Sequence, residues 1–221
     1  KLSSSKRSET ITNYKILTDQ QEYILTIFEK RVNPEDLPFF INLQKDLASQ
    51  GFHCPLPIEN NIGNNINVIK GKSAVIISFL DGKQLQSILP HHCREVGSII
   101  SKFTNITKSS KLMRKNSMNI DAWEKIFKKC KENSTGIYDT YLEILENELS
   151  YLKKNWPNNL PEAIIHADLF PDNVFFIKNK ISGIIDFYFS CKDFIAYEIA
   201  LTINAWCFDL VNGFQHKNYI S

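Results

Sequence analysis

The sequence predicts an α+β fold with two lobes: a small antiparallel β lobe with one helix at residues 1–80, and a mostly helical lobe at residues 81–221. Two patterns indicate this division. Runs of β-branched and aromatic residues dominate the first third of the chain, whereas apolar residues recur at helical spacing through the middle. A chain of 221 residues with 43% hydrophobic side chains can bury a sizeable core, which excludes a disordered chain.

Strand signals dominate the first lobe. Two short runs, residues 13–18 and 23–28, are separated by polar residues and predict an antiparallel hairpin. Apolar side chains then recur at helical spacing over residues 37–47, and Gly51 marks the end of that helix. Residues 74–80 form an almost continuous apolar run that ends in a turn signal. We therefore expect a buried central strand there.

The second lobe is predicted to contain helices first and strands later. Helical periodicity covers residues 90–104, and an apolar stripe over residues 138–152 is typical of a helix that buries one face in the core. A last helix is expected at residues 194–208. Three short apolar strands precede it, at residues 163–166, 173–177 and 181–186. Polar residues stand where these strands end, which makes this region the candidate for chemistry.

Composition narrows the class of partner. With 26 Lys and Arg against 24 Asp and Glu, the net charge of +2 is too even to indicate a nucleic-acid or membrane surface, so we expect a small-molecule partner. The five cysteines are odd in number and form no CxxC pair, so we expect neither a disulfide framework nor a zinc site in this protein. This cysteine pattern is typical of a protein of the reducing cytoplasm. No apolar run approaches the roughly 18 residues of a membrane span. The chain begins with Lys1 and not with methionine, which we interpret as a piece of a longer product.

The most informative segment lies between two of the predicted strands. It has the pattern His-x-Asp, at His166 and Asp168, followed by Asn173, and the next strand ends at Asp186. Each residue alone is usually a turn former or a structural hydrogen-bonding group, but their joint occurrence in this context is specific. Phosphoryl transfer to an alcohol needs a carboxylate near the nucleophilic hydroxyl and oxygen ligands for Mg²⁺. Asp168 suits the first role, and Asn173 and Asp186 suit the second. The arrangement resembles the catalytic loop of protein-kinase-like phosphotransferases.

Longer phrases extend this resemblance. The segments 166–176, 183–189 and 204–208 resemble the homoserine kinase branch of the aminoglycoside/choline phosphotransferase family. Upstream segments at residues 25–32 and 54–57 resemble phrases from the first lobe of the same family, so that the resemblance covers nearly the whole chain. It implies a two-lobed protein-kinase-like fold and an enzyme that transfers a phosphoryl group from ATP, with Mg²⁺, to the side-chain hydroxyl of L-homoserine, a step toward threonine.

The resemblance also implies roles for individual residues. Asp168 is the expected catalytic base, and His166 belongs to the same catalytic loop, where we expect it to brace the backbone and not to touch the substrate. Asn173 and Asp186 are the expected Mg²⁺ ligands. The backbone of Ile77, Ser78 and Phe79 is expected to bind adenine, and Lys30 is a nearby cation for the ATP phosphates. Arg114 and Asn116 are expected to bind a substrate carboxylate, and the equal alternative for these two residues is a solvated loop. Asp193 and Glu198 are expected to brace the catalytic loop.

Three departures from the family pattern keep other functions open. The turn at residues 8–14 has no glycine, and Thr26 stands where many relatives place a phosphate-binding lysine. Members of this family continue into further helices after the segment that resembles residues 204–208, so we expect that this chain lacks the last helices of the second lobe. The alternatives are a phosphotransferase for another small alcohol, such as choline, an aminoglycoside or methylthioribose, and a degenerate kinase-like protein that binds without catalysis.

Overall fold

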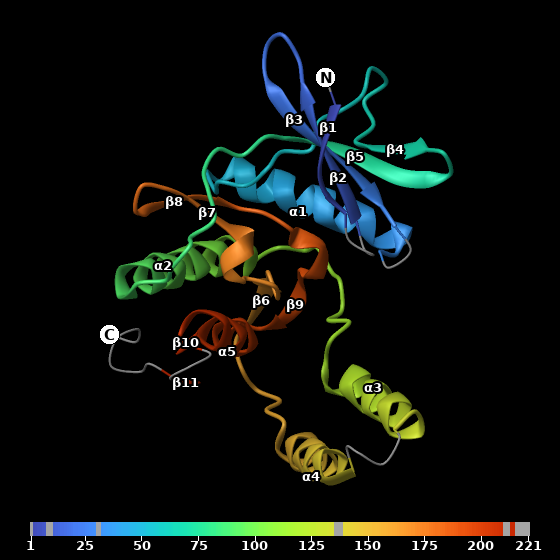
Figure 1. Ribbon diagram of the computed structural model, residues 1–221, viewed down its shortest axis with the longest axis vertical. Helices are drawn as coiled ribbons and strands as arrows, with labels where there is room; N and C mark the ends of the chain where they lie inside the picture. The colour runs from blue at the N-terminus through green and yellow to red at the C-terminus, as the bar shows by residue number, and fades with distance from the viewer. Residues whose placement is uncertain (1, 8–10, 30–31, 135–138, 210–212, 215–221) are drawn as a thin grey trace.

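A computed structural model describes residues 2–7, 11–29, 32–134, 139–209 and 213–214. Its first part is a five-stranded antiparallel sheet in the order β1-β2-β3-β5-β4 (Figure 1). The strands are β1 (Leu2–Arg7), β2 (Ile11–Leu17), β3 (Glu22–Phe28), β4 (Ile66–Ile69) and β5 (Lys72–Ser78). The short turn η1 (Pro34–Asp36) leads into α1 (Leu37–Ser49), which lies beneath the sheet. All of these elements fall within the first 80 residues.

The hairpin and the buried strand predicted for this part are confirmed. Strands β2 and β3 pair antiparallel from Ile11 opposite Phe28 to Leu17 opposite Glu22. Strand β5 lies between β3 and β4, with Ala74 and Val75 fully buried. Helix α1 buries seven residues, most of them apolar. It ends at Ser49, two residues before Gly51, which has a left-handed backbone conformation and which the sequence predicted as the end of this helix. The edge strand β1 was not predicted, because its sequence is polar and carries no alternating pattern.

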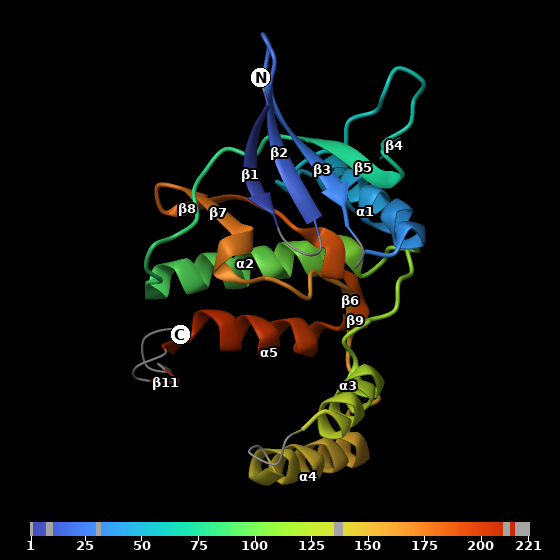
Figure 2. The ribbon, with the colours of Figure 1, turned by 45° about the vertical axis from the view of Figure 1, so that its right-hand side comes forward.

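The second part combines helices with two small strand pairs. Its helices are α2 (Pro90–Thr107), α3 (Ile120–Glu132), α4 (Asp139–Asn155) and α5 (Ile195–Trp206). Strand β6 (Glu162–Ile165) pairs with β9 (Cys191–Phe194), β7 (Val174–Ile177) pairs with β8 (Lys180–Ile184), and β10 (Phe208–Asp209) pairs with β11 (Gly213–Phe214). In Figure 2, α2 and α5 run one above the other, and β7 and β8 lie between α2 and the sheet. None of the described helices is long and apolar enough to cross a membrane.

Helices α3 and α4 form an arm that stands apart from the rest of the molecule in both ribbon views (Figures 1 and 2). They pack on each other, and Trp123 of α3 contacts Trp156 and Tyr197. The prediction that the apolar stripe of α4 belongs to the core is wrong for Tyr141 and Leu145, which are 67% and 54% exposed. The predicted helix is present, but α3 covers only part of its apolar stripe.

One glycine lets β8 approach the segments that follow α1 and β5 closely. A Cβ atom at Gly183, in β8, would lie 2.8 Å from the carbonyl oxygen of His53 and 2.8 Å from a methyl carbon of Leu80. We expect Gly183→Ala to lower the free energy of unfolding by about 1–3 kcal/mol through overpacking. Gly97→Ala is the matched control, because Gly97 lies exposed on α2 with open space around it, and alanine there should stabilise the helix by about 0.5–1 kcal/mol. Urea unfolding of both variants tests this, and equal stabilities would contradict it.

Candidate active site

A cavity of about 440 Å³ lies between the sheet and the loop that follows β6. Ile77, Phe79 and Leu80 line it from the end of β5 and the segment beyond it, while Asn173 and Asp186 line it from the second part of the chain. The structure thus brings residues more than 90 positions apart in the sequence to one cavity. The structure shows that the segment after β5 and the segment around Asn173 and Asp186 line the same cavity. That ATP and Mg²⁺ bind there stays a prediction.

Asp168 adjoins this cavity through Asn173. The side-chain amide of Asn173, in η2 (Pro171–Asn173), donates from Nδ2 to the backbone oxygen of Asp168 at 2.8 Å and to its carboxylate Oδ2 at 2.9 Å. Burial, and then the negative charge of Asp186, raise the pKa of Asp168 to about 6. A carboxylate with this pKa is a better proton acceptor than an ordinary aspartate and is still ionised at neutral pH.

Asp186 follows β8 in a left-handed conformation, with φ of 65°. Aspartate tolerates this region better than most residues do, because its short side chain can hydrogen-bond locally. The backbone N–H of Ile185 donates to the carbonyl of Asn173 at 3.0 Å, so the two predicted metal-binding segments are joined directly. A hard divalent cation prefers carboxylate and amide oxygens, and it would offset the repulsion between Asp168 and Asp186 that the raised pKa reflects. The donor set therefore fits Mg²⁺.

His166 lies inside the protein and not at the cavity. Its side chain is 1% exposed, and its Nε2 lies 3.0 Å from the carbonyl oxygen of Ile185, to which it donates. Burial lowers the pKa of His166 to about 4, so the imidazole is neutral at physiological pH. The His166 side chain thus contacts the backbone of the residue directly before Asp186, and its role in the reaction stays a prediction.

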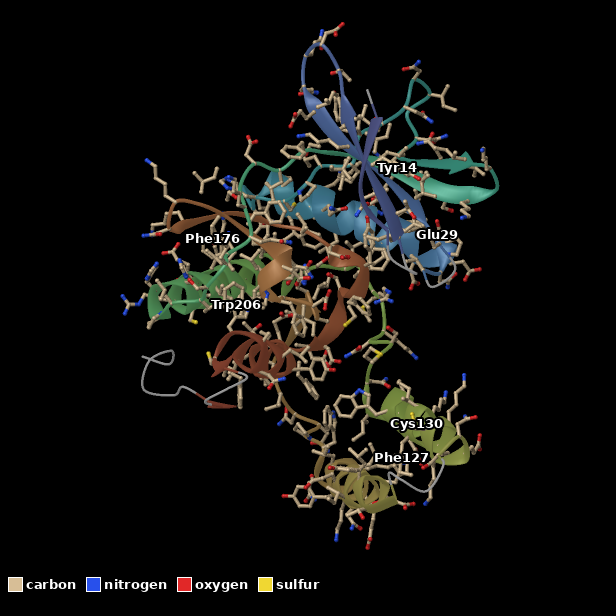
Figure 3. All side chains as sticks on the ribbon, in the orientation of Figure 1. Tyr14, Glu29, Phe127, Cys130, Phe176 and Trp206 are labelled. Atoms are coloured by element: carbon tan, nitrogen blue, oxygen red, sulfur yellow. The ribbon has the colours of Figure 1, made fainter. Side chains whose placement is uncertain are left out.

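Two side chains of α5 hold the candidate catalytic loop, residues 166–173. Ala167 has a positive φ of 60°, and its N–H donates to Glu198 Oε2 at 2.8 Å. Trp206 donates from Nε1 to the carbonyl of Leu169 at 2.7 Å, and its ring lies beside Phe176, with ring centroids 6.4 Å apart (Figure 3). These contacts fix the backbone on both sides of Asp168. The prediction that Glu198 braces the loop is confirmed.

The buried carboxyl of Glu198 should make stability depend on pH. Burial raises its pKa to about 7, well above the 4.5 of an exposed glutamate, so the folded state binds the proton more tightly than the unfolded chain. The stabilising proton is present below about pH 4.5 and is lost as the pH rises through 7. At pH 8 the cost is on the order of 3 kcal/mol.

Glu198→Gln removes this titration and keeps an oxygen that can accept from Ala167. We expect the Tm of Glu198→Gln to exceed that of the wild type at pH 8 and the difference to shrink toward pH 5. Differential scanning calorimetry from pH 5 to 8 measures it, with Glu146→Gln, an exposed site on α4, as the control. Parallel Tm profiles for wild type and Glu198→Gln would contradict the assignment.

The predicted adenine contacts lie along the cavity, but two of their N–H groups are already used. Ser78 donates its N–H to Leu56 at 2.8 Å, and Phe79 donates its N–H to Glu22 at 3.3 Å. Within the described residues, the next N–H along the chain, that of Leu80, meets no protein acceptor, and Leu80 lines the cavity. The sequence pattern predicted this segment, but it could not show that the N–H groups of Ser78 and Phe79 donate to other backbone carbonyls.

The other residues that the sequence predicted for the site lie away from the cavity or outside the described residues. Lys30 lies outside the described residues, as do residues 8–10 of the glycine-free turn. Asn116 is buried, and its Nδ2 donates to Asp193 Oδ2 at 2.7 Å, so that Asp193 holds Asn116 and not the catalytic loop. Arg114 binds Asp36 and two backbone carbonyls of the protein. The substrate roles of Arg114 and Asn116 stay predictions.

Sequence reasoning missed two residues of this site. Gln84 donates from Nε2 to the carbonyl of Asp172 at 2.7 Å and so links the segment after β5 to the catalytic loop. Tyr188 lines the cavity, and burial followed by the charge of Asp186 raises the pKa of its hydroxyl. Gln84 carries no motif, whereas the position of Tyr188 just after Asp186 was a signal that could have drawn attention to it.

Comparison with solved structures defines the class of fold. Amicoumacin kinase, solved with AMP-PNP, Ca²⁺ and Ami, superposes with a TM-score of 0.75 at 13% identity, over 92% of this chain and 63% of that chain. A thermostable mutant of aminoglycoside phosphotransferase APH(4)-Ia superposes with a TM-score of 0.70 at 15% identity, over 91% of this chain and 71% of that chain. These likenesses show the fold, which is the predicted α+β protein-kinase-like fold.

Sequence comparison then identifies the family. The model of the phosphotransferase enzyme family matches residues 7–217, and the chain belongs to that family. The homoserine kinase of Sinorhizobium fredii is 42% identical over 198 residues, which are 90% of this chain and 61% of that protein. The homoserine kinase of Paramagnetospirillum magneticum is 43% identical over 210 residues, which are 92% of this chain and 64% of that protein. The chain thus spans less than two thirds of the length of these relatives.

Proposed function

We propose that this chain carries the catalytic loop of a cytoplasmic kinase that transfers the γ-phosphoryl group of ATP to the side-chain hydroxyl of L-homoserine, in threonine biosynthesis. The observation that supports it most is the meeting of Asp168, Asn173 and Asp186 beside one cavity. The identity to homoserine kinases supports the choice of alcohol.

In this proposal Asp168 accepts the proton of the substrate hydroxyl as the oxygen attacks phosphorus. Asn173 orients the Asp168 carboxylate through the bond to Oδ2 at 2.9 Å, which leaves its own Oδ1 for a cation. The loop cannot shift easily, because Glu198 and Trp206 hold its backbone. The protein's contribution is therefore mainly positioning and charge stabilisation, as a loose phosphoryl-transfer transition state requires.

Asp186 and Asn173 are the proposed ligands of Mg²⁺, which would neutralise charge on the ATP phosphates when bound. The described residues that line the cavity include no lysine or arginine, so the cation carries more of this task than in a site that also has a lysine. For the adenine ring we propose the N–H of Leu80 as the hydrogen-bond donor, because the N–H groups of Ser78 and Phe79 already donate within the protein.

The test is ADP release by the purified chain with ATP and Mg²⁺ and one of four alcohols: L-homoserine, choline, methylthioribose or kanamycin. The proposal expects stimulation by L-homoserine and none with Asp168→Asn. Stimulation by another alcohol alone would overturn the choice of substrate while keeping the chemistry. Binding of Mg²⁺ and ATP without turnover of any alcohol would instead favour a non-catalytic kinase-like protein.

A further inference from the structure

Arg114 joins the two parts of the chain at the edge of the candidate site. Its Nε donates to Asp36 Oδ2 at 2.8 Å, and its Nη1 donates to the carbonyls of Ser190 at 3.0 Å and Phe189 at 3.3 Å. The Arg114 side chain is 12% exposed. Its guanidinium therefore donates three hydrogen bonds to groups of the protein. Because the side chain is largely buried, these charge-assisted bonds are stronger than they would be at an open surface.

The three hydrogen-bond partners of the Arg114 side chain lie in two different segments. Asp36 is the last residue of η1 and the residue directly before α1, and its carboxylate makes no capping bond to that helix. Phe189 is the last residue of η3 (Phe187–Phe189), the turn that starts directly after Asp186, and Ser190 follows it. The N–H of Lys192 donates to the carbonyl of Arg114 at 2.8 Å, so the backbone of Arg114 is itself anchored to β9.

Aromatic contacts run beside these hydrogen bonds. The guanidinium lies over the ring of Phe40, 5.0 Å from its centroid, and Phe40 meets Tyr188 edge to face at 5.5 Å. Tyr188 in turn meets Phe28 of β3 at 5.0 Å. A movement of α1 relative to the η3 turn would break the ion pair, the ring stacking and the edge contact together.

We propose that Arg114 is a positioning residue that holds Asp186 in its metal-binding place by fixing the η3 turn to the start of α1. Asp186 is one residue from η3 and sits in a left-handed conformation, so a shift of the Phe189 and Ser190 carbonyls changes where its carboxylate points. The inference rests on the proposed function in one respect, namely that Asp186 binds Mg²⁺. It is an alternative to the substrate-carboxylate role that the sequence suggested for Arg114.

The experiment measures Mg²⁺-dependent binding of ADP by isothermal titration calorimetry, which needs no alcohol substrate. Arg114→Lys keeps the charge but loses the fork that reaches Asp36 and two carbonyls, and Asp36→Asn removes the ion pair with little change of shape. We expect both to raise the Mg²⁺ concentration for half-maximal ADP binding by about tenfold. Lys45→Met is the matched control, because it removes an exposed ion pair with Glu59 from the same helix and should leave the Mg²⁺ requirement unchanged.

The outcomes separate the possible roles of Arg114. An unchanged Mg²⁺ requirement in Arg114→Lys and Asp36→Asn, with wild-type Tm, overturns the proposal. A rise in the KM for L-homoserine without a change in the Mg²⁺ requirement overturns it too and restores the substrate role. If Arg114→Lys does not fold, Asp36→Asn decides alone. If the wild type binds Mg²⁺ and ADP but turns over no alcohol, the proposed function fails while the binding assay still decides the role of Arg114.

Discussion

Asp168→Asn should lower kcat by at least about a hundredfold while the affinity for Mg²⁺ and ADP stays within a few fold of the wild type. The carboxylate is the group expected to take the proton of the alcohol, whereas the proposed nucleotide contacts are residues that line the cavity. An amide can still accept the hydrogen bond from Asn173, so the loop should keep its shape. Steady-state kinetics and calorimetric titration with ADP measure the two effects separately.

Asp172→Asn is the control for this variant, because it removes the same charge from the same loop at an exposed position. Its kcat should change far less. The pH profile adds a second criterion: activity requires ionised Asp168 and is lost as the pH falls through about 6, or lower once Mg²⁺ offsets the Asp186 charge that raises this pKa. Near-wild-type kcat in Asp168→Asn would remove Asp168 from the role of base.

Asp186→Asn should cause the largest loss of Mg²⁺-dependent binding, because a carboxylate contributes a full negative charge to a hard cation and an amide contributes only a dipole. Asparagine is preferable to alanine here, since it also tolerates the left-handed conformation at φ of 65° and so leaves the turn intact. Turnover should fall to the background of the assay. By contrast, Asn173→Ala should keep a weakened activity that added Mg²⁺ partly restores.

A Mg²⁺ titration of turnover in both variants, read beside their melting temperatures, distinguishes a metal ligand from a turn former. If Asp186 only shapes the turn after β8, the variant loses stability but retains the wild-type Mg²⁺ requirement, and the metal assignment is wrong. The variant should also lower the pKa of Asp168, because the charge of Asp186 is one of the causes that raise it.

The sequence predicted the parts of this site that depend on residue type and short spacing. Asp168, Asn173 and Asp186 could be found because each follows or precedes a recognisable apolar strand. The left-handed conformation of Ala167 could not, since an alanine gives no signal for it. The pairing of Arg114 with Asp36 was equally hidden, because it joins residues 78 positions apart and depends on how α1 lies against the η3 turn.

The hold of Trp206 on the catalytic loop also provides an optical signal. The chain has three tryptophans, and Trp123 and Trp156 lie together on the arm, 5.5 Å apart, whereas Trp206 is 2% exposed and bonded to Leu169. Replacing Trp123 and Trp156 with phenylalanine would leave one indole whose fluorescence comes from beneath the catalytic loop. Its emission would shift to longer wavelength whenever the bond to Leu169 opens and water reaches the ring. A loop movement during turnover would then be visible in a stopped-flow trace, without any attached dye.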